Sequence, residues 1–117
     1  MGNANSRKGR FGEVTAIRFL EEQGHRILER NWKYRRVEID IISVCGQTLH
    51  FTEVKTRFSN CFGLPESAVH SVKLNRLKLG AEAYLEEHPQ WQRISFDVLA
   101  ISIRGQQTEI RHFLDLS

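Results

Sequence analysis

Two short segments on either side of a tight turn constrain this chain more than any other feature. Residues 37–44 are rich in β-branched side chains, and residues 48–57 follow the turn-like sequence Cys45-Gly46-Gln47. This pattern predicts an antiparallel hairpin. Each segment also carries charged residues among its apolar ones, which is costly in the interior of a sheet unless the charges are paired or bind an ion.

The charges of the predicted hairpin fall close together. Side chains alternate across a strand, so the apolar face of residues 49 and 51 continues into Glu53 and Lys55. Pairing about a turn centred near residues 46 and 47 places Asp40 opposite Glu53, with their Cβ atoms about 5 Å apart. Two carboxylates at that distance repel each other unless a cation lies between them, and hard divalent cations take such oxygen ligands.

Two other interpretations of these residues stay open. In the plainer one, Glu53 and Lys55 form a surface ion pair and Asp40 is a solvated residue at a sheet edge. A zinc site is also conceivable, although its spacings match no familiar zinc pattern. Its ligands would be Cys45, His50, Cys61 and His70.

The rest of the chain predicts an α/β fold. Apolar residues recur at helical spacing in residues 9–23 and again in residues 66–87, where Pro89 ends the pattern. Residues 58–65 read as a loop. Further strands are expected at residues 25–34, 93–103 and 108–114. The order αβββαββ describes a mixed central sheet flanked by helices, and 117 residues with no linker suit one domain over residues 1–117.

Composition narrows the class of protein. The net charge is +3, with basic residues gathered near residues 7–10, 35–36 and 73–78, which favours a polyanionic partner. No apolar run approaches the roughly 18 residues of a membrane span, and no apolar segment follows the basic N-terminus as in a signal peptide. We therefore expect a cytoplasmic protein with no membrane partner.

The ordered motifs resemble those of the YraN-like family of small uncharacterised bacterial proteins. Asp40 followed by Glu53-Val54-Lys55 also resembles the PD-(D/E)xK signature of restriction-endonuclease-like nucleases, and Glu13 resembles the helix acid of archaeal Holliday-junction resolvases. The family match runs through Gly9-x-x-Gly12-Glu13-x-x-Ala16, Glu29-Arg30-Asn31-Trp32, Glu38-Ile39-Asp40-Ile41-Ile42, Phe51-Thr52-Glu53-Val54-Lys55-Thr56-Arg57 and Phe96-Asp97-Val98. Val37 and Ser95 stand where the family usually has Gly and Arg.

The resemblance implies a restriction-endonuclease-like core and a metal-dependent active site. It assigns the metal site, for Mg²⁺ or Mn²⁺, to Glu13, Asp40 and Glu53, and the role of catalytic lysine to Lys55. Basic positions of the family match Arg57 and Lys73. Together with Arg10 from the basic N-terminal cluster, these are the residues expected to contact nucleic acid.

The implied function is an Mg²⁺- or Mn²⁺-dependent endonuclease acting on DNA, branched or duplex. Junction resolvases act as symmetric dimers, so a homodimer is the corresponding assembly. Two alternatives are a nucleic-acid-binding module with the same fold but little catalysis, and a structural partner in a larger complex. Outside the implied site, we expect Asp97 to be a structural partner and both tryptophans, Trp32 and Trp91, to pack against the core.

Overall fold

The computed structural model describes residues 4–58 and 74–116. In these residues, five strands form a single sheet in chain order, β1-β2-β3-β4-β5. All neighbouring strands are antiparallel except β3 and β4, which are parallel. The strands are β1 (Arg26–Tyr34), β2 (Val37–Cys45), β3 (Thr48–Phe58), β4 (Arg93–Arg104) and β5 (Gln107–Phe113).

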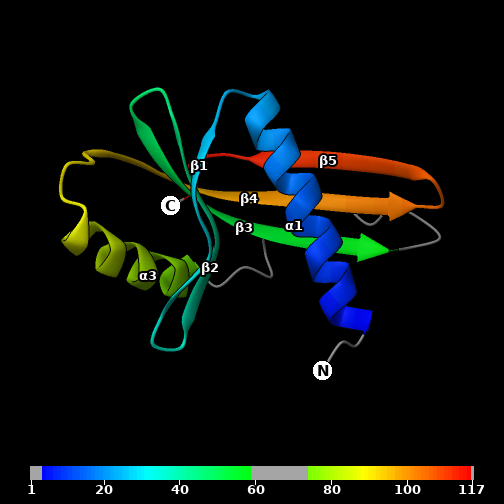
Figure 1. Cartoon of the computed structure of the whole chain (residues 1–117), viewed down its shortest axis with the longest axis horizontal. Helices are drawn as coiled ribbons and strands as arrows, with labels where there is room; N and C mark the ends of the chain where they lie inside the picture. The colour runs from blue at the N-terminus through cyan, green and yellow to red at the C-terminus, as the bar shows by residue number, and fades with distance from the viewer. Residues whose placement is uncertain (1–3, 59–73, 117) are drawn as a thin grey trace.

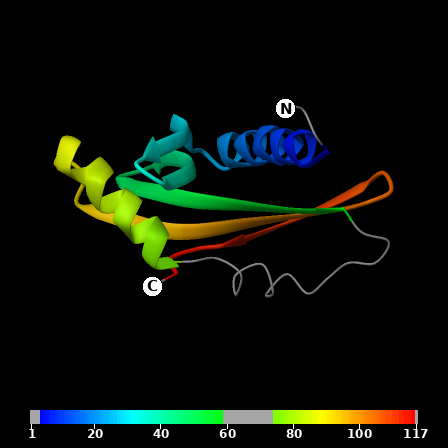
Figure 2. The same ribbon diagram turned by 90° about the horizontal axis from the view of Figure 1, so that it is seen from below.

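Helix α1 (Ala4–Glu22) crosses one face of the sheet and α3 (Leu74–Glu87) packs on the other (Figures 1 and 2). The parallel pairing of β3 with β4 requires a crossover between them, and α3 lies on that connection. The predicted fold class, a mixed sheet flanked by helices in the order αβββαββ, is confirmed.

The element boundaries follow the predictions to within one residue, except at the start of α1. Helix α1 begins at Ala4 instead of residue 9, because a single glycine such as Gly9 costs a helix only about 1 kcal/mol relative to alanine. The predicted loop at residues 58–65 starts one residue too early, because Phe58 still belongs to β3. The rest of this loop, residues 59–65, and the start of the second predicted helix, residues 66–73, lie outside the described residues. The end of that helix is confirmed, since α3 stops at Glu87 before Pro89.

The β2–β3 hairpin has the predicted register. Cys45 pairs with Thr48, and the ladder continues to Ile41 and Thr52. The turn needs a backbone that glycine adopts readily, and Gly46 has a φ of 62°. If this register is extended by one residue, Asp40 lies opposite Glu53.

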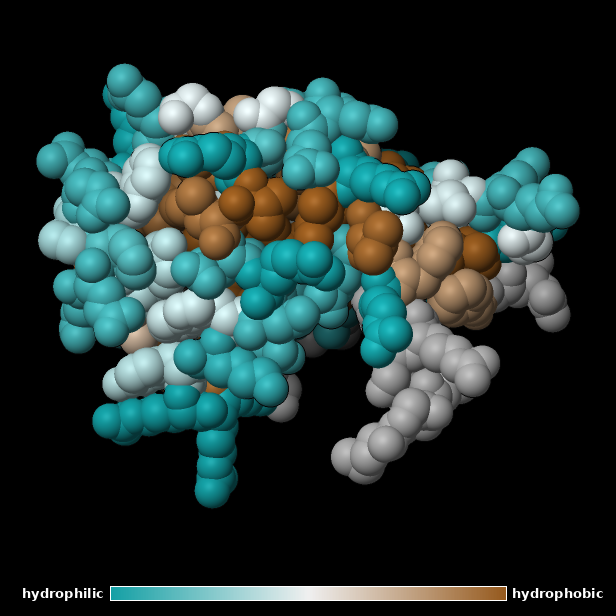
Figure 3. All heavy atoms as spheres, viewed as in Figure 1, coloured by the Kyte–Doolittle hydropathy of each residue, from teal (hydrophilic) through white to brown (hydrophobic). Residues whose placement is uncertain are grey.

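Two apolar layers hold the helices on the sheet. Under α1, the buried side chains are Ala16, Leu20, Ile41, Leu99, Ile101 and Ile103. Under α3, they are Ile39, Ile42, Leu49, Phe51, Leu77, Ala81 and Tyr84, and both tryptophans pack against them. The expectation that Trp32 and Trp91 serve packing is confirmed. The face seen in Figure 3 is mostly hydrophilic with an apolar band across it.

Within the described residues, no helix is long and apolar enough to cross a membrane.

Candidate active site

Asp40 lies where β2 separates from β3. Beyond the Ile41–Thr52 pair, β3 continues beside β4 while its ladder with β2 ends. The freed backbone N–H of Val54 donates a hydrogen bond of 2.8 Å to Oδ2 of Asp40. The carboxylate thus takes the place of a strand partner and is fixed at the point of divergence.

Asp40 and Glu53 form a close acidic pair. The two carboxyl groups are close enough to hydrogen-bond to each other when one of them carries a proton. Burial, this hydrogen bond and repulsion by Glu53 raise the pKa of Asp40 from 3.8 to about 8, and the charge of Glu13 adds to the rise. The pair therefore holds either a proton or, as the sequence predicts, a cation.

Glu13 reaches this region from helix α1. A side chain on Gly12 would overlap the hydroxyl of Thr56, so only glycine lets α1 approach β3 so closely. This contact brings Glu13 near enough to act on the ionisation of Asp40. The Glu13 carboxylate accepts a hydrogen bond of 2.7 Å from the side-chain amide of Asn31.

Lys55 lies two residues beyond Glu53 on the same strand. Glu53 is in register with Val98 of β4 and Lys55 with Ala100, and both charged side chains are partly buried. Among the described residues, no ion pair joins Lys55 to Glu53. The surface ion pair of the plainer interpretation is therefore absent from the described residues.

The donor set suits a hard divalent cation even though the acids do not form a complete cage. Within residues 4–58 and 74–116, no three His, Cys, Asp or Glu side chains converge closely enough to hold a metal ion by themselves. Mg²⁺ does not require such a cage, because it is usually bound by one or two carboxylates together with water and substrate phosphate. Asp40 and Glu53 would supply the two carboxylates, and Glu13 would contribute directly or through water.

The predicted basic residues are only partly described. Arg10 near the start of α1 and Arg57 near the end of β3 are exposed, while Lys73 lies outside the described residues. Two neighbours of Lys73 have structural contacts: Arg76 donates to the Arg36 carbonyl at 2.7 Å, and the Lys78 ammonium lies 5.9 Å from the centre of the Phe96 ring. These two basic side chains of α3 therefore make contacts within the protein, with the residues that follow β1 and with β4.

A second polar cluster surrounds Asp97, the one acid on β4. Its carboxylate is fully buried and contacts Nδ1 of His50 at 2.6 Å. Ser95 Oγ donates at 2.6 Å and the Asp115 N–H at 3.1 Å. Nε2 of His112 lies 3.5 Å away, too far for a good hydrogen bond.

These partners keep Asp97 charged. Burial by itself would raise the pKa of Asp97, but the favourable interactions with His112, His50, Ser95 and the Asp115 N–H outweigh it and hold the pKa well below the usual range. His25, whose ring lies 4.6 Å from that of His50, behaves in the opposite way. Burial lowers the pKa of His25 to about 4, with help from the two neighbouring histidines. Asp97 is the structural partner that its sequence context predicts.

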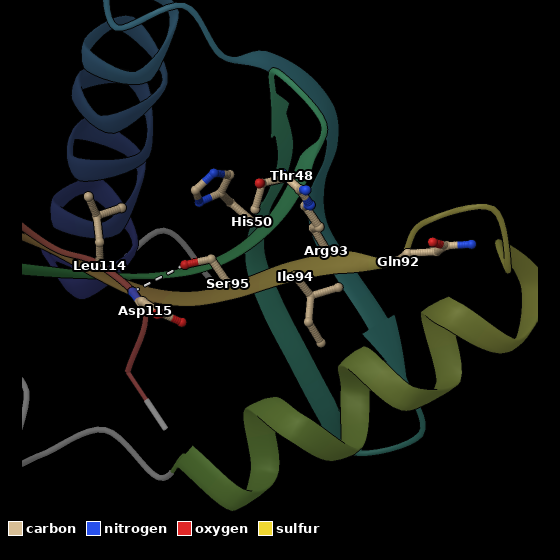
Figure 4. A pocket seen from close by; sticks show the side chains of 8 residues that line it. All are labelled: Thr48, His50, Gln92, Arg93, Ile94, Ser95, Leu114 and Asp115. Carbon is tan, nitrogen blue, oxygen red and sulfur yellow. Dashed lines mark hydrogen bonds between the residues drawn. The ribbon is translucent and has the colours of Figure 1, made fainter.

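The Asp97 cluster borders a cavity of about 560 Å³ (Figure 4). The lining includes Thr48 and Arg93, the first residues of β3 and β4, whereas Glu53 and Lys55 come later along β3. The cavity is therefore separate from the acidic pair. The conceivable zinc site gains no support from its described members, since His50 binds Asp97 and the Cys45 thiol donates to the Gln23 carbonyl.

Sequence reasoning did not assign two features of this region. Asn31 belongs to a motif of the family, but the motif assigns it no role. Its position opposite Asp40 follows from the β1–β2 register, which the sequence alone does not give. The three histidines near Asp97 are far apart in the chain. Their signal was three histidines in or next to strand segments, which is too weak to predict a cluster.

Comparison with known proteins decides the family. The model of the uncharacterised protein family UPF0102 matches residues 12–101. The chain belongs to this family. A UPF0102 protein of Rhodococcus opacus (strain B4) is 43% identical over 109 residues, covering 92% of each chain. A UPF0102 protein of Syntrophomonas wolfei is 38% identical over 112 residues, covering 95% of this chain and 97% of the relative.

Among solved structures, the chain is similar to SfsA of Pyrococcus furiosus in complex with Ca²⁺. The TM-score is 0.35 and the identity 14%, over 92% of this chain and 62% of that chain. A likeness at this level carries no conclusion about the function of this UPF0102 protein. The family match confirms the resemblance that the ordered motifs indicate.

Proposed function

We propose that this UPF0102 protein is a cytoplasmic Mg²⁺- or Mn²⁺-dependent endonuclease that hydrolyses phosphodiester bonds in DNA. One observation carries the proposal: the carboxyl groups of Asp40 and Glu53 are held against each other beside Glu13, where a proton or a cation must relieve their repulsion. A partly buried acid whose pKa is strongly raised by burial and by a neighbouring acid, as that of Asp40 is, is typical of functional sites. The nearby Lys55 supplies the remaining group that phosphodiester hydrolysis requires.

Each residue then has a distinct role. Asp40 and Glu53 bind the ion directly, and Glu13 binds it directly or through water. When bound, the ion supplies positive charge that activates water and offsets charge developing on the phosphate. Lys55 orients the attacking water or helps to deprotonate it, and offsets the negative charge of the transition state.

DNA is the proposed substrate, branched or duplex, and the exposed Arg10 and Arg57 lie on the two elements that carry Glu13 and Glu53. Cutting two matching strands of a junction would need two copies of this acid set, which a twofold-symmetric dimer provides. Light scattering with and without branched DNA tests this assembly, and a strict monomer under both conditions would exclude it.

The metal is tested by its effect on unfolding. Mn²⁺ should raise the melting temperature of the wild-type protein, because a ligand that binds only the folded state stabilises it. Asp40→Asn should remove that shift and abolish nicking of branched DNA in Mn²⁺. The matched control is Glu38→Gln, an exposed acid on the same strand that is in register with Lys33, which should keep both properties.

The outcomes separate the alternatives. A wild-type protein that binds DNA but cuts no DNA or RNA substrate would favour a nucleic-acid-binding module without catalysis. An Mn²⁺-induced shift that survives in Asp40→Asn would place the metal elsewhere and overturn the site.

A further inference from the structure

Asn31 occupies an unusual position within β1. Its neighbours Arg30 and Trp32 pair with Ile41 and Ile39 of β2, so Asn31 falls in the same row as Asp40. The next strand continues this row to Glu53, by the register of the hairpin. A residue of β1 that had no assigned role is thus in line with the acidic pair.

The backbone of Asn31 departs from strand geometry. Its φ is 51°, in the left-handed region that few residues other than glycine adopt and that asparagine tolerates. The β1–β2 register is the same on both sides of Asn31, so the left-handed residue does not absorb an insertion. Its effect is instead to change the direction of its own side chain.

That side chain binds the third acid. Nδ2 of Asn31 donates a 2.7 Å hydrogen bond to Oε1 of Glu13. Within the described part of the chain, the other carboxylate oxygen of Glu13 has no hydrogen-bond partner. Helix α1 also contacts β1, so the bond connects two elements that flank the site.

We infer that Asn31 is a positioning residue, whose amide holds Glu13 in the orientation that leaves one carboxylate oxygen available to a divalent cation at the Asp40–Glu53 pair. This inference rests on the proposed function, because it assumes that the acids bind a metal ion. Hydrogen-bond partners that orient metal ligands typically contribute about 10- to 100-fold to metal affinity or activity. Asn31 is expected to act at this level.

The decisive variant is Asn31→Gly. Glycine adopts the left-handed backbone at least as readily as asparagine, so it preserves the conformation and removes only the amide. We expect Asn31→Gly to remain folded and to bind Mn²⁺ about 10-fold or more weakly in a calorimetric titration. The control is Arg35→Gly, which changes another left-handed residue, with a φ of 56°, at the turn between β1 and β2. It should leave the affinity for Mn²⁺ unchanged.

A double-mutant cycle with Glu13→Ala identifies the route of the effect. If Asn31 acts through Glu13, Asn31→Gly should cause no further loss of Mn²⁺ affinity or nicking rate in the Glu13→Ala background. Wild-type affinity in Asn31→Gly, or losses that simply add in the double variant, would overturn the inference.

The same cycle separates this inference from the proposed function. If the wild-type protein binds Mn²⁺ and cuts nothing, the nuclease proposal fails and the Mn²⁺ affinities alone decide the role of Asn31. If it does not bind Mn²⁺, the proposed site fails, and Asn31 as a positioning residue for a metal ligand fails with it. A melting-temperature shift caused by Asn31→Gly in the wild-type but not the Glu13→Ala background would then still establish that the two side chains are coupled.

Discussion

Asp40 and Asp97 lie on strands of the same sheet, and their surroundings move their pKa values in opposite directions. Asp97 is enclosed by groups that donate hydrogen bonds or attract its charge, which lower its pKa despite complete burial. Asp40 is partly buried next to Glu53 and Glu13, and burial together with these acids raises its pKa to about 8. The first arrangement satisfies a charge within the protein, whereas in the second one acid must hold a proton or, under the proposed function, the pair binds a cation.

Under the proposed function, this difference separates a structural acid from an acid of the active site. Burial alone does not make the distinction, because the more deeply buried carboxylate is the one that the protein itself neutralises. The two acids differ in the number of groups that contact them. Asp97 has contacts from His50, Ser95 and the Asp115 N–H, while Asp40 has the Val54 N–H. Adjacent acids with few donors around them raise each other's pKa, and such perturbed groups cluster at functional sites.

The largest expected effect is on stability, and it differs in sign between the two acids. Asp97→Asn should lower the free energy of unfolding by about 3–5 kcal/mol, because it removes the charge from a buried network. Asp40→Asn, in the absence of metal, should instead leave the protein as stable or more stable, because the neutral amide needs no proton to lie beside Glu53 at pH 7. Urea denaturation at pH 7 measures both. Equal destabilisation by the two substitutions would contradict the comparison.

The next effect concerns Lys55, which should act in catalysis and not in binding. Lys55→Ala should bind Mn²⁺ and DNA normally and cut about 10²- to 10³-fold more slowly, because the lysine stabilises charge only in the transition state. Nicking of branched DNA beside a metal titration tests this, with Asp40→Ala losing both properties. Cutting that survives undiminished in Lys55→Ala would assign the activity to another site or to a contaminant.

A smaller effect tests the packing that places Glu13 in the acidic site. Gly12→Ala should cost about 1–3 kcal/mol of stability, because the added methyl group would overlap the Thr56 hydroxyl and push α1 away from β3. It should also weaken Mn²⁺ binding by displacing Glu13. The double variant Gly12→Ala/Thr56→Ala removes the overlapping hydroxyl but keeps the Cβ of residue 56 at 3.2 Å, so it should recover part of both losses. No recovery would show that the close contact does not set the position of Glu13.

The two clusters should also give opposite pH dependences. The folded pKa of Asp40, about 8, lies above its ordinary value of 3.8, so its contribution to stability is complete below pH 3.8 and is lost as the pH rises through 8. The folded pKa of His25, about 4, lies below its ordinary 6.5, so its contribution is present above pH 6.5 and is lost as the pH falls towards 4. Each group changes stability by at most about 1.4 kcal/mol per pH unit.

Asp40→Asn separates these contributions. In metal-free wild-type protein they oppose each other between pH 4 and 6.5. The variant keeps the contribution of His25, which increases stability as the pH rises. The lowered pKa of Asp97 also makes stability rise with pH, but only at pH values below 3.8. The free energy of unfolding of the variant should therefore rise with pH between pH 4 and 6.5. Parallel pH profiles for wild type and variant would show that Asp40 does not titrate as its surroundings require.

The smallest effect concerns the basic residues outside both clusters. If Arg57 and Lys73 touch DNA phosphates, alanine at either position should reduce the slope of log affinity against log salt by about one unit. Affinity should fall similarly for all DNA sequences. If the log affinity of the wild-type protein hardly changes with log salt, the protein makes no phosphate contacts.

The sequence by itself determined the elements and much of the acidic pair. The β2–β3 register follows from a short turn at Gly46 and from alternation along two strands, so the approach of Asp40 to Glu53 needs only local information. The order of helices and strands follows from periodicity in the same way. The extra turns at the start of α1 were missed because the pattern gave no sign that the helix continues before Gly9.

Only the tertiary structure decided which distant residues surround each acid. Asn31 and Glu13 are 18 positions apart, and His50 and Asp97 are 47 apart. Such contacts depend on how closely α1 approaches β3 at Gly12 and on the parallel placement of β3 beside β4. Periodicity reports which face a residue occupies but not what lies opposite that face. For that reason, two acids in similar strand patterns acquired opposite pKa shifts that only packing could set.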